Sequence, residues 1–304
     1  MFERTVQRID FVGRWKVWFA ISGILLLAGL VSIGLGRLNL GIDFEGGAKF
    51  TVSGVDRHLS TGEVRGQVLP NYAAKGAVIQ PTGRNGYQIQ TPVLSQKQIQ
   101  RVEQNLKHGL GGEVSVTSVS PTFGGQVQTQ ALQAVGAAFL IIVLFISFRF
   151  EFAFALAAML ALVHDLLMTI GFYAIVGREV SLITVVAVLT ILGYSLYDTI
   201  IIFDRIRENT PAVGYNRRRF DQTINTSIRQ VIRRSIYTSL STVIPVAALL
   251  IFGESTLSDF AFALLVGIIS GTYSSIFIAS PILSLYKAWR GGKLGRAAPA
   301  SSSS

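Results

Sequence analysis

The sequence predicts an α-helical membrane protein with six transmembrane helices and a small α+β domain inserted between the first two. Two observations lead to this fold class. Half of the 304 residues are hydrophobic and only 14% are charged, which is too apolar for a water-soluble domain of this length. Between two of the apolar segments, a more polar stretch at 37–130 follows the periodicities of strands and amphipathic helices.

Six apolar segments approach the ~20 residues that a helix needs to cross a bilayer. They are Val17–Leu35, Ala131–Phe148, Phe152–Val176, Ser181–Phe203, Ser235–Phe252 and Phe260–Leu285. Basic residues precede the first segment, as in a signal peptide, but its apolar core is long and lacks a clear small-x-small cleavage site. We therefore expect an uncleaved anchor within 1–36 and a region of five further transmembrane helices at 131–290.

The distribution of lysine and arginine predicts the orientation in the membrane. Basic residues cluster in the N-terminal segment, the loop at 204–234 and the tail, whereas the short loops 177–180 and 253–259 hold only Arg178. Both termini are therefore expected in the cytoplasm, with a disordered tail at 291–304. The net charge of +10 is then a topology signal that suits membrane lipids, and it requires no nucleic-acid partner.

The segment at 37–130 is expected to form the α+β domain on the non-cytoplasmic side. Alternating apolar and polar residues predict four strands, and two stretches with helical spacing separate them. The expected elements are a strand at 48–52, a helix at 60–68, a hairpin of strands 77–80 and 87–91 around the turn GRNG (83–86), a helix at 95–106 and a strand at 113–119. The order βαββαβ is that of a ferredoxin-like domain.

Two carboxyl groups lie inside apolar segments, where a charge is costly. Asp198 lies in the run GYSLYDT (193–199), and Asp165 follows His164 in the motif VHD (163–165). An acid buried in a helix bundle is by default a proton or ion site, and the alternative is a structural hydrogen bond or ion pair between helices. A movable arginine near Asp198 could switch this acid between its protonated and ionised forms. The candidate arginines are Arg205, Arg229, Arg233 and Arg234.

Small residues predict close packing of the later spans. Gly267 and Gly271 lie four residues apart in GIISG, and Gly193 lies within the acid-bearing fourth span. Glycines let a neighbouring helix approach, and nearby hydroxyls such as that of Ser274 can hydrogen-bond across the contact.

No enzymatic site is evident in the sequence. An aspartyl protease needs two carboxyl groups that share a proton, but at 1.5 Å per residue Asp165 and Asp198 differ in depth by roughly 10 Å. His164 and Asp165 are adjacent and should point apart on a helix, which argues against a metal site. Cysteine and the P-loop, GxSxG, HExxH and GxGD motifs are missing. We expect neither an enzyme nor a cofactor, but work driven by an ion gradient or a partner.

Five motifs carry a resemblance to a known family. They are GIDFEGG (41–47), VHD (163–165), LGYSLYDTIIIFDRIREN (192–209), NTSIRQVIRRSIYTSLST (225–242) and FALLVGIISGTYSSIFIASPIL (262–283). In this order, and over nearly the whole chain, the sequence resembles the SecF proteins of the SecD/SecF family, within the resistance–nodulation–division superfamily of transporters.

The resemblance implies a subunit of the Sec protein-export machinery that uses the proton-motive force. With SecD, it would form a pseudo-symmetric helix bundle in the bacterial inner membrane and assist late translocation of unfolded polypeptides, after SecA and the SecYEG channel. YajC and YidC are further partners of such a subunit. A sodium gradient remains open as the driving force, since a carboxylate with hydroxyls serves either ion.

Roles for single residues follow from the same resemblance. Asp198 would be the proton-coupling carboxylate and Arg234 its basic partner, with Asp165 and His164 as secondary members of the proton relay. The motif GIDFEGG would form a hinge between the first helix and the exterior domain. The hinge residues are Gly41, Asp43, Gly46 and Gly47.

Two other functions stay open from the residues alone. One is an exporter of lipid or small molecules from the same superfamily, although the chain is short for that role. The other is a non-transporting membrane scaffold whose acids are structural. Export with and without a proton gradient distinguishes them, because a scaffold should not depend on the gradient.

Overall fold

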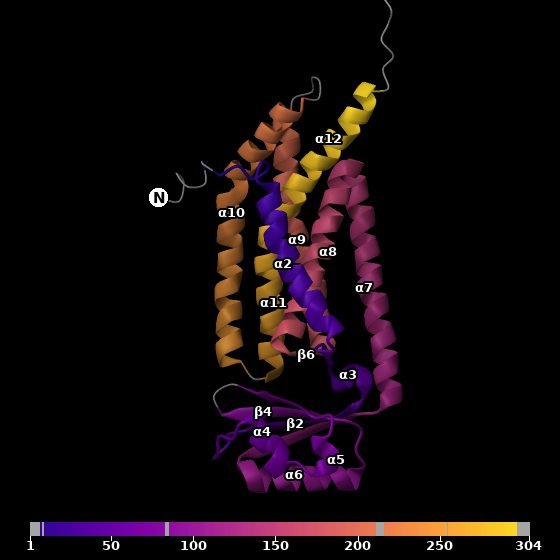
Figure 1. Ribbon diagram of the computed structural model, residues 1–304, viewed down its shortest axis with the longest axis vertical. Coiled ribbons are helices and arrows are strands. Elements are labelled where there is room, and N and C mark those ends of the chain that lie inside the picture. Colours follow the sequence, from indigo (N-terminus) through magenta and orange to yellow (C-terminus); the bar gives the residue numbers. More distant parts are fainter. Residues whose placement is uncertain (1–6, 8, 83–84, 211–215, 254, 297–304) are drawn as a thin grey trace, which may run out of the picture.

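The protein consists of a bundle of membrane helices with an α/β domain at one end (Figure 1). The structure is a computed structural model, and it describes all residues except 1–6, 8, 83–84, 211–215, 254 and 297–304. In this described part, six helical segments are long and apolar enough to cross a membrane, as the sequence predicted. The protein is therefore a multi-pass α-helical membrane protein.

The spans are α2 (Trp15–Gly34), α7 (Pro121–Arg149), α8 (Phe152–Val176), α9 (Leu182–Asn209), α10 (Arg217–Phe252) and a composite last span. The last span runs through α11 (Ser255–Ser274), the π-helical turn η2 (Ser275–Ala279) and α12 (Ser280–Arg296). At least half of the apolar window is buried in α8, α9 and the last span, against 17% or less in α2, α7 and α10. Helices α8, α9 and the last span thus form the centre of the bundle, and α2, α7 and α10 form its periphery.

Two helices begin well before the apolar segments that the sequence indicated. α7 begins at Pro121 and not at Ala131, because the Ser120 hydroxyl caps the helix and proline suits a first helical turn. The α/β domain ends correspondingly earlier than predicted. α10 begins at Arg217, so helix fills most of the predicted loop at 204–234.

Two predicted segments lie partly outside the described residues. The tail at 291–304 was predicted to be disordered, but helix α12 includes its residues up to Arg296. This first part of the tail is therefore helical. The rest of the tail lies outside the described part, as do residues 83–84 of the predicted turn.

The α/β domain holds an antiparallel sheet of strand order β3-β4-β2-β5. The strands are β2 (Gly47–Ser53), β3 (Val78–Pro81), β4 (Gly86–Thr91) and β5 (Glu113–Val119). The connections contain α4 (Thr61–Glu63), η1 (Val64–Val68) and α5 (Asn71–Ala74) after β2, and α6 (Gln96–Leu110) after β4. Strands and helices therefore follow each other in the predicted order.

The two faces of this sheet lie in different surroundings. Phe50 and Ile89 point to one face and are fully buried in the core that the sheet forms with α6. Because side chains alternate along a strand, Lys49, Gln88 and Gln90 point to the other face. Figure 1 shows that this second face looks towards the membrane helices.

A second sheet of two short strands lies where the domain meets the bundle. β1 (Asn39–Leu40) pairs in parallel with β6 (Glu179–Val180), which lies in the link between α8 and α9. The single turn α3 (Ile42–Glu45) follows β1. Strands of two residues have no periodicity, so the sequence did not predict this pairing.

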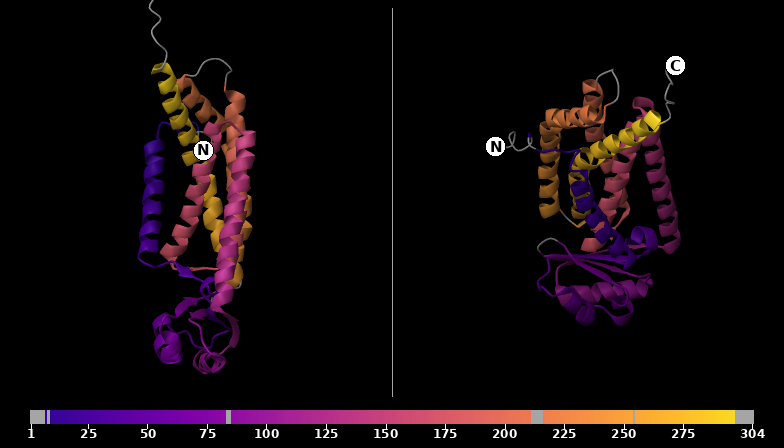
Figure 2. Two further views of the ribbon diagram at one scale, coloured as in Figure 1. Left: turned by 90° about the vertical axis from the view of Figure 1, so that its right-hand side faces the viewer. Right: turned by 45° about the horizontal axis from the view of Figure 1, so that its top comes forward.

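Helix α2 packs on one outer face of the bundle, against α8 (Figure 2). Two glycines bring the backbones into contact, since a Cβ added at Gly29 would lie 2.7 Å from the Cα of Gly171. The Ser32 hydroxyl donates to the carbonyl of Ala174 at 2.9 Å. Small residues and a hydrogen bond therefore fasten α2 to the central helices.

Candidate functional site

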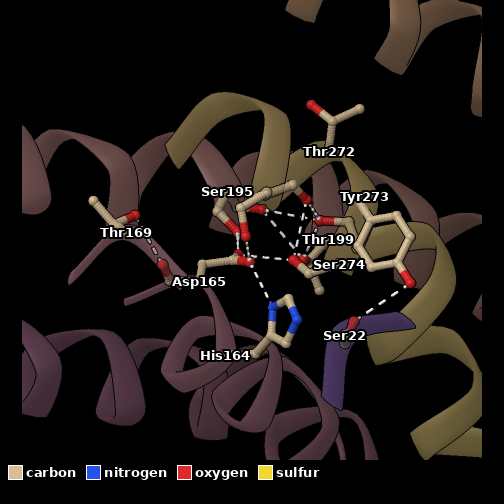
Figure 3. Close-up of polar contacts among 12 residues, drawn as sticks. Ser22, His164, Asp165, Thr169, Ser195, Thr199, Thr272, Tyr273 and Ser274 are labelled. Carbon is tan, nitrogen blue, oxygen red and sulfur yellow. Dashed lines mark hydrogen bonds and ion pairs between the residues drawn. The ribbon is translucent and has the colours of Figure 1, made fainter. Parts of the chain in front are cut away.

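Asp165 lies on α8 in the centre of the bundle and is fully buried, at 0% exposure. Three serine hydroxyls donate to its carboxylate: that of Ser195 on α9 at 2.6 Å, and those of Ser270 and Ser274 on α11 at 2.8 and 2.7 Å. Figure 3 shows how Ser195 and Ser274 converge on Asp165 from the neighbouring helices. Asp165 therefore ties α8, α9 and α11 together.

The glycines of α11 allow this convergence. A Cβ added at Gly271 would lie 2.8 Å from the Cβ of Ser195, and one at Gly267 would collide with the side chain of Ile191. α9 and α11 can therefore approach until their hydroxyls reach the same carboxylate. Gly193 is different, because it is exposed and an added Cβ there would meet nothing within 4 Å. No helix of the described chain packs against Gly193, so its predicted packing role stays a prediction.

His164 lies beside this cluster. Its Nδ1 is 3.0 Å from Oδ1 of Asp165, so the two adjacent side chains meet and do not point apart as the sequence argument assumed. Its Nε2 is buried without a hydrogen-bond partner, and its ring stacks on that of Tyr273 at 6.4 Å between centroids. In the described part of the chain, no group of three histidines, aspartates or glutamates could hold a metal ion.

A second polar layer lies one turn further along α9. The hydroxyls of Thr199 and Ser275 are 2.7 Å apart, and Ser275 also donates to the carbonyl of Gly271 at 2.8 Å. Ser275 is the first residue of the π turn η2. π turns carry an extra residue that disturbs the regular helix bonds, and they are frequent at functional sites.

Asp198 lies on α9 but does not join the Asp165 cluster. It is 2% exposed, and its Oδ2 is buried without a hydrogen-bond partner. The Ser235 hydroxyl and the Arg234 guanidinium of α10 lie near this carboxyl group, but among the described residues neither makes a hydrogen bond to its Oδ2. The Ser235 hydroxyl is likewise buried and unpartnered. The two buried groups thus face each other across the contact of α9 and α10 without a hydrogen bond.

The contact of Asp165 with Ser195 also corrects the predicted depth difference. Ser195 lies one turn before Asp198, so the two carboxyl groups differ in depth by about 5 Å and not by roughly 10 Å. Among the described residues no hydrogen bond joins them, and each interacts with a different helix. They do not form a dyad that shares a proton.

Arg234 is held by a neighbour of Asp198. Its Nη2 donates to the hydroxyl of Tyr197 at 2.8 Å, and its guanidinium carbon lies 5.9 Å from the centre of the same ring. The direct ion pair with Asp198 that the family resemblance implied is not formed in this conformation. Of the other candidates, Arg205 pairs with Glu208, and Arg229 donates to a carbonyl of the N-terminal segment.

The motif GIDFEGG packs against the start of α9. The N–H of Gly41 donates to the backbone of β6 at 2.8 Å, and the N–H of Leu182, the first residue of α9, donates to Oδ2 of Asp43 at 3.0 Å. Gly46 and Gly47 have φ of 75° and 133°, which only glycine adopts readily. The motif therefore contains bends at these two glycines, but its front part is bound to the α8–α9 link.

Comparison with known proteins places the chain in a family. Residues 99–289 match the family described as "Protein export membrane protein SecD/SecF, C-terminal". The chain belongs to the SecD/SecF family.

Three members illustrate the relation. "Protein translocase subunit SecF" of Thermodesulfovibrio yellowstonii is 38% identical over 285 residues, which cover 91% of this chain and 94% of that protein. "Protein translocase subunit SecDF" of Bacillus subtilis is 35% identical over 95% of this chain but only 39% of its own length. The crystal structure of SecDF from Thermus thermophilus, described as a translocon-associated membrane protein, has a TM-score of 0.82 at 32% identity over 92% of this chain and 39% of that one. The chain therefore spans about two fifths of a SecDF protein, and its relatives are transport subunits and not enzymes.

In this SecD/SecF chain, sequence reasoning located the two acids but missed most of their surroundings. Ser195 was placed with Asp198 in the run GYSLYDT and not with Asp165, and Ser270 was not singled out, although Ser270 and Ser274 lie one helical turn apart beside the small residues of α11. Glu179 was missed as well. It is 2% exposed in a link of a few residues, where no pattern distinguishes a buried glutamate from a solvated one.

Proposed function

We propose that the chain is the SecF-type subunit of a protein translocase and acts with SecD in the bacterial inner membrane. It uses the proton-motive force to assist late translocation of unfolded polypeptides, after SecA and the SecYEG channel. Both termini lie in the cytoplasm, and the α/β domain is a ferredoxin-like domain on the periplasmic side. The relatives named SecF and SecDF support the assignment and the SecD partner. YajC and YidC follow from the family resemblance.

The observation that carries the proton-driven step is the unpartnered Oδ2 of Asp198. A carboxylate buried in a membrane bundle is costly, and binding a proton removes that cost. The protonated group can donate to the Ser235 hydroxyl that faces it. The ionised group is an acceptor for Arg234, which can leave the Tyr197 hydroxyl to reach it. Loss and gain of one proton thus exchange two arrangements of α9 against α10.

Asp165 has a different task in this proposal. Its carboxylate accepts three hydroxyl hydrogen bonds from α9 and α11 and has His164 beside it, so it holds these helices to α8. It acts as the anchor about which α9 moves. A displacement of α9 would strain the Ser195 bond and the contact between Thr199 and Ser275 first, because these join α9 to the anchored helices.

A proton suits this geometry better than a sodium ion. Hard cations take several oxygen ligands arranged around them. Among the described residues, Oδ2 of Asp198 has no hydrogen-bond partner, and the hydroxyl that faces it, that of Ser235, is by itself fewer oxygen ligands than such a cation takes. We therefore propose that the coupling ion is the proton.

Export into membrane vesicles under an imposed ion gradient tests this proposal. The chain is assembled with SecD, and Asp198→Asn removes proton exchange while it keeps the side-chain volume. Asp204→Asn is the matched control on the same helix, because Asp204 pairs with Arg149 and Arg207 at the end of the bundle. We expect Asp198→Asn to lose the part of export that depends on a proton gradient, and Asp204→Asn to retain it.

Other outcomes of this experiment would point elsewhere. Normal gradient-dependent export by an assembled Asp198→Asn variant would contradict the coupling role. A contribution of the parent chain that does not depend on any gradient would favour a scaffold. Export driven by a sodium gradient alone would replace the proton as the coupling ion.

A further inference from the structure

The face of the sheet that carries Lys49, Gln88 and Gln90 binds the link between α8 and α9, and this contact lies outside the site described above. Glu179 of this link is 2% exposed. Lys49 on β2 places its Nζ 2.8 Å from Oε1 of Glu179, and Gln88 on β4 donates from Nε2 to Oε2 at 2.7 Å. A single buried carboxylate is therefore shared by the two central strands of the sheet.

Three amide side chains extend this contact. Gln80 on β3 and Asn39 on β1 both donate to the carbonyl of Gly177 at 2.8 Å, and Gln90 on β4 donates to the carbonyl of Leu40 at 3.0 Å. Gly177 ends α8 in a left-handed conformation, with φ of 74°. The sheet thus binds the residue that caps the end of α8 and, through Glu179, the segment that leads into α9.

The start of α9 is bound from the GIDFEGG side as well. Asp43 accepts from the N–H of Leu182, which is one of the helix donors that have no partner within the helix. β1 pairs with β6 in register, and Gly41 leaves no room for a side chain because its Cβ would collide with the Glu179 carboxylate. The link is therefore held between β1, the sheet and its own helix.

The helix that begins at this link carries the proton-binding residue. α9 runs without a proline from Leu182 to Asn209, so it behaves as one rod. At 1.5 Å per residue, Asp198 lies about 24 Å from Leu182 along that rod. A movement of α9 at Asp198 therefore also displaces its first turn, where the sheet is attached.

We propose that Glu179 and Asp43 are positioning residues that fasten the sheet of the α/β domain to the first turn of α9, so that the sheet and α9 move as one body. Removing one partner of a buried ion pair leaves the other charge buried and uncompensated, which strongly destabilises the contact. The attachment itself is independent of the proposed function. Its use, to carry a proton-driven displacement of α9 to the α/β domain, rests on the proposed function.

The attachment is measured by the distance between two spin labels on the full chain in lipid nanodiscs. The chain has no cysteine, so cysteines introduced at exposed Lys97 on α6 and exposed Val186 on α9 are the only labelling sites. We expect one narrow distance distribution in the parent chain and a broad one after Lys49→Glu or Glu179→Lys. The exchanged pair, with both substitutions, should restore the narrow distribution.

The exchanged pair separates attachment from simple loss of structure, since it keeps every side-chain type at the contact. Glu103→Gln is the control, because it breaks an exposed ion pair of 2.7 Å with Lys107 on α6 and should change nothing. If a charge reversal prevents folding, Glu179→Gln and Asp43→Asn give the same readout in a milder form. A narrow distribution in all variants, or no recovery in the exchanged pair, would overturn the positioning role.

A second label pair separates this inference from the proposed function. Labels at Lys97 and at Phe252, the exposed end of α10, report movement of the domain between acidic and alkaline pH. We expect a shift in the parent chain that is lost in Asp198→Asn and in Lys49→Glu. A shift that survives Lys49→Glu overturns the positioning role and leaves the proton-driven step standing. No shift in the parent chain, together with broadening in Lys49→Glu, supports the attachment and contradicts the proton-driven step.

Discussion

The substitution Gly271→Ala tests how tightly α9 and α11 must pack around Asp165. The added carbon would lie 2.8 Å from the Cβ of Ser195, whereas carbon atoms prefer about 3.5–4.0 Å, so the helices must separate by about 1 Å. Overpacking of this kind costs about 1–3 kcal/mol. The same displacement breaks the 2.6 Å hydrogen bond from Ser195 to Asp165, worth about 0.6 kcal/mol in a membrane bundle.

A favourable contribution opposes these costs. Alanine is a better helix former than glycine by about 0.8–1.0 kcal/mol. The net loss of stability is therefore about 0.6–2.8 kcal/mol, which lowers the folding equilibrium constant by roughly 3- to 110-fold. Equilibrium unfolding in mixed detergent and lipid micelles, followed by tryptophan fluorescence, measures this loss. The parent chain and the variant are compared under the same micelle composition.

Gly193→Ala is the matched control for this prediction. Gly193 is also a membrane-helix glycine, but an added Cβ there meets nothing within 4 Å. Only the gain in helix propensity remains, so the variant should be as stable as the parent chain or up to about 1 kcal/mol more stable. If Gly271→Ala is no less stable than Gly193→Ala, the close contact between α9 and α11 does not exist as described, and the reasoning is refuted.

Three further predictions follow from contacts elsewhere in the chain. Gly29→Ala presses a methyl group to 2.7 Å from the α8 backbone and, after the gain in helix propensity is subtracted, should lower stability by up to about 2 kcal/mol in the same unfolding measurement, whereas Gly23→Ala, with open space around it, should not. Tyr197→Phe removes the hydroxyl that holds Arg234, so gradient-dependent export should change while assembly with SecD, judged by co-purification, does not. Hydrogen bonds from Ser60 lower the pKa of Glu63, so this helix cap stabilises above the ordinary carboxyl value of 4.5 and weakens as pH falls through the lowered pKa. Amide hydrogen exchange at the cap should accelerate in acid for the parent chain and depend less on pH in Glu63→Gln.

The membrane helices could be predicted because hydrocarbon imposes a length and a composition on each span. The same signal misses helix that continues outside the hydrocarbon, and for that reason the start of α7 was predicted at Ala131. Its first residues, from Pro121, are mostly polar or small, and their helical state depends on a cap at Ser120.

The acids of the candidate site could be predicted because a carboxyl group stands out in an apolar helix. Their partners could not be predicted from single helices. Serine is common in membrane helices and can hydrogen-bond to its own backbone, so nothing in the sequence distinguishes Ser195, which reaches Asp165, from any other hydroxyl. Whether Arg234 binds Asp198 or Tyr197 depends on the rotation of α9 against α10, which hydropathy does not determine.

The π turn between α11 and α12 has a consequence for how this protein tolerates changes in length. A π turn accommodates one residue more than the α-helix around it, while the helix faces before and after it keep their directions. A deletion of one residue within 275–279 would remove the bulge and leave the serines of α11 aimed at Asp165. The same deletion further along the span would turn every later side chain by about 100° around the helix axis. Single-residue deletions among natural relatives should therefore be tolerated at this turn and rare in the remainder of the last span.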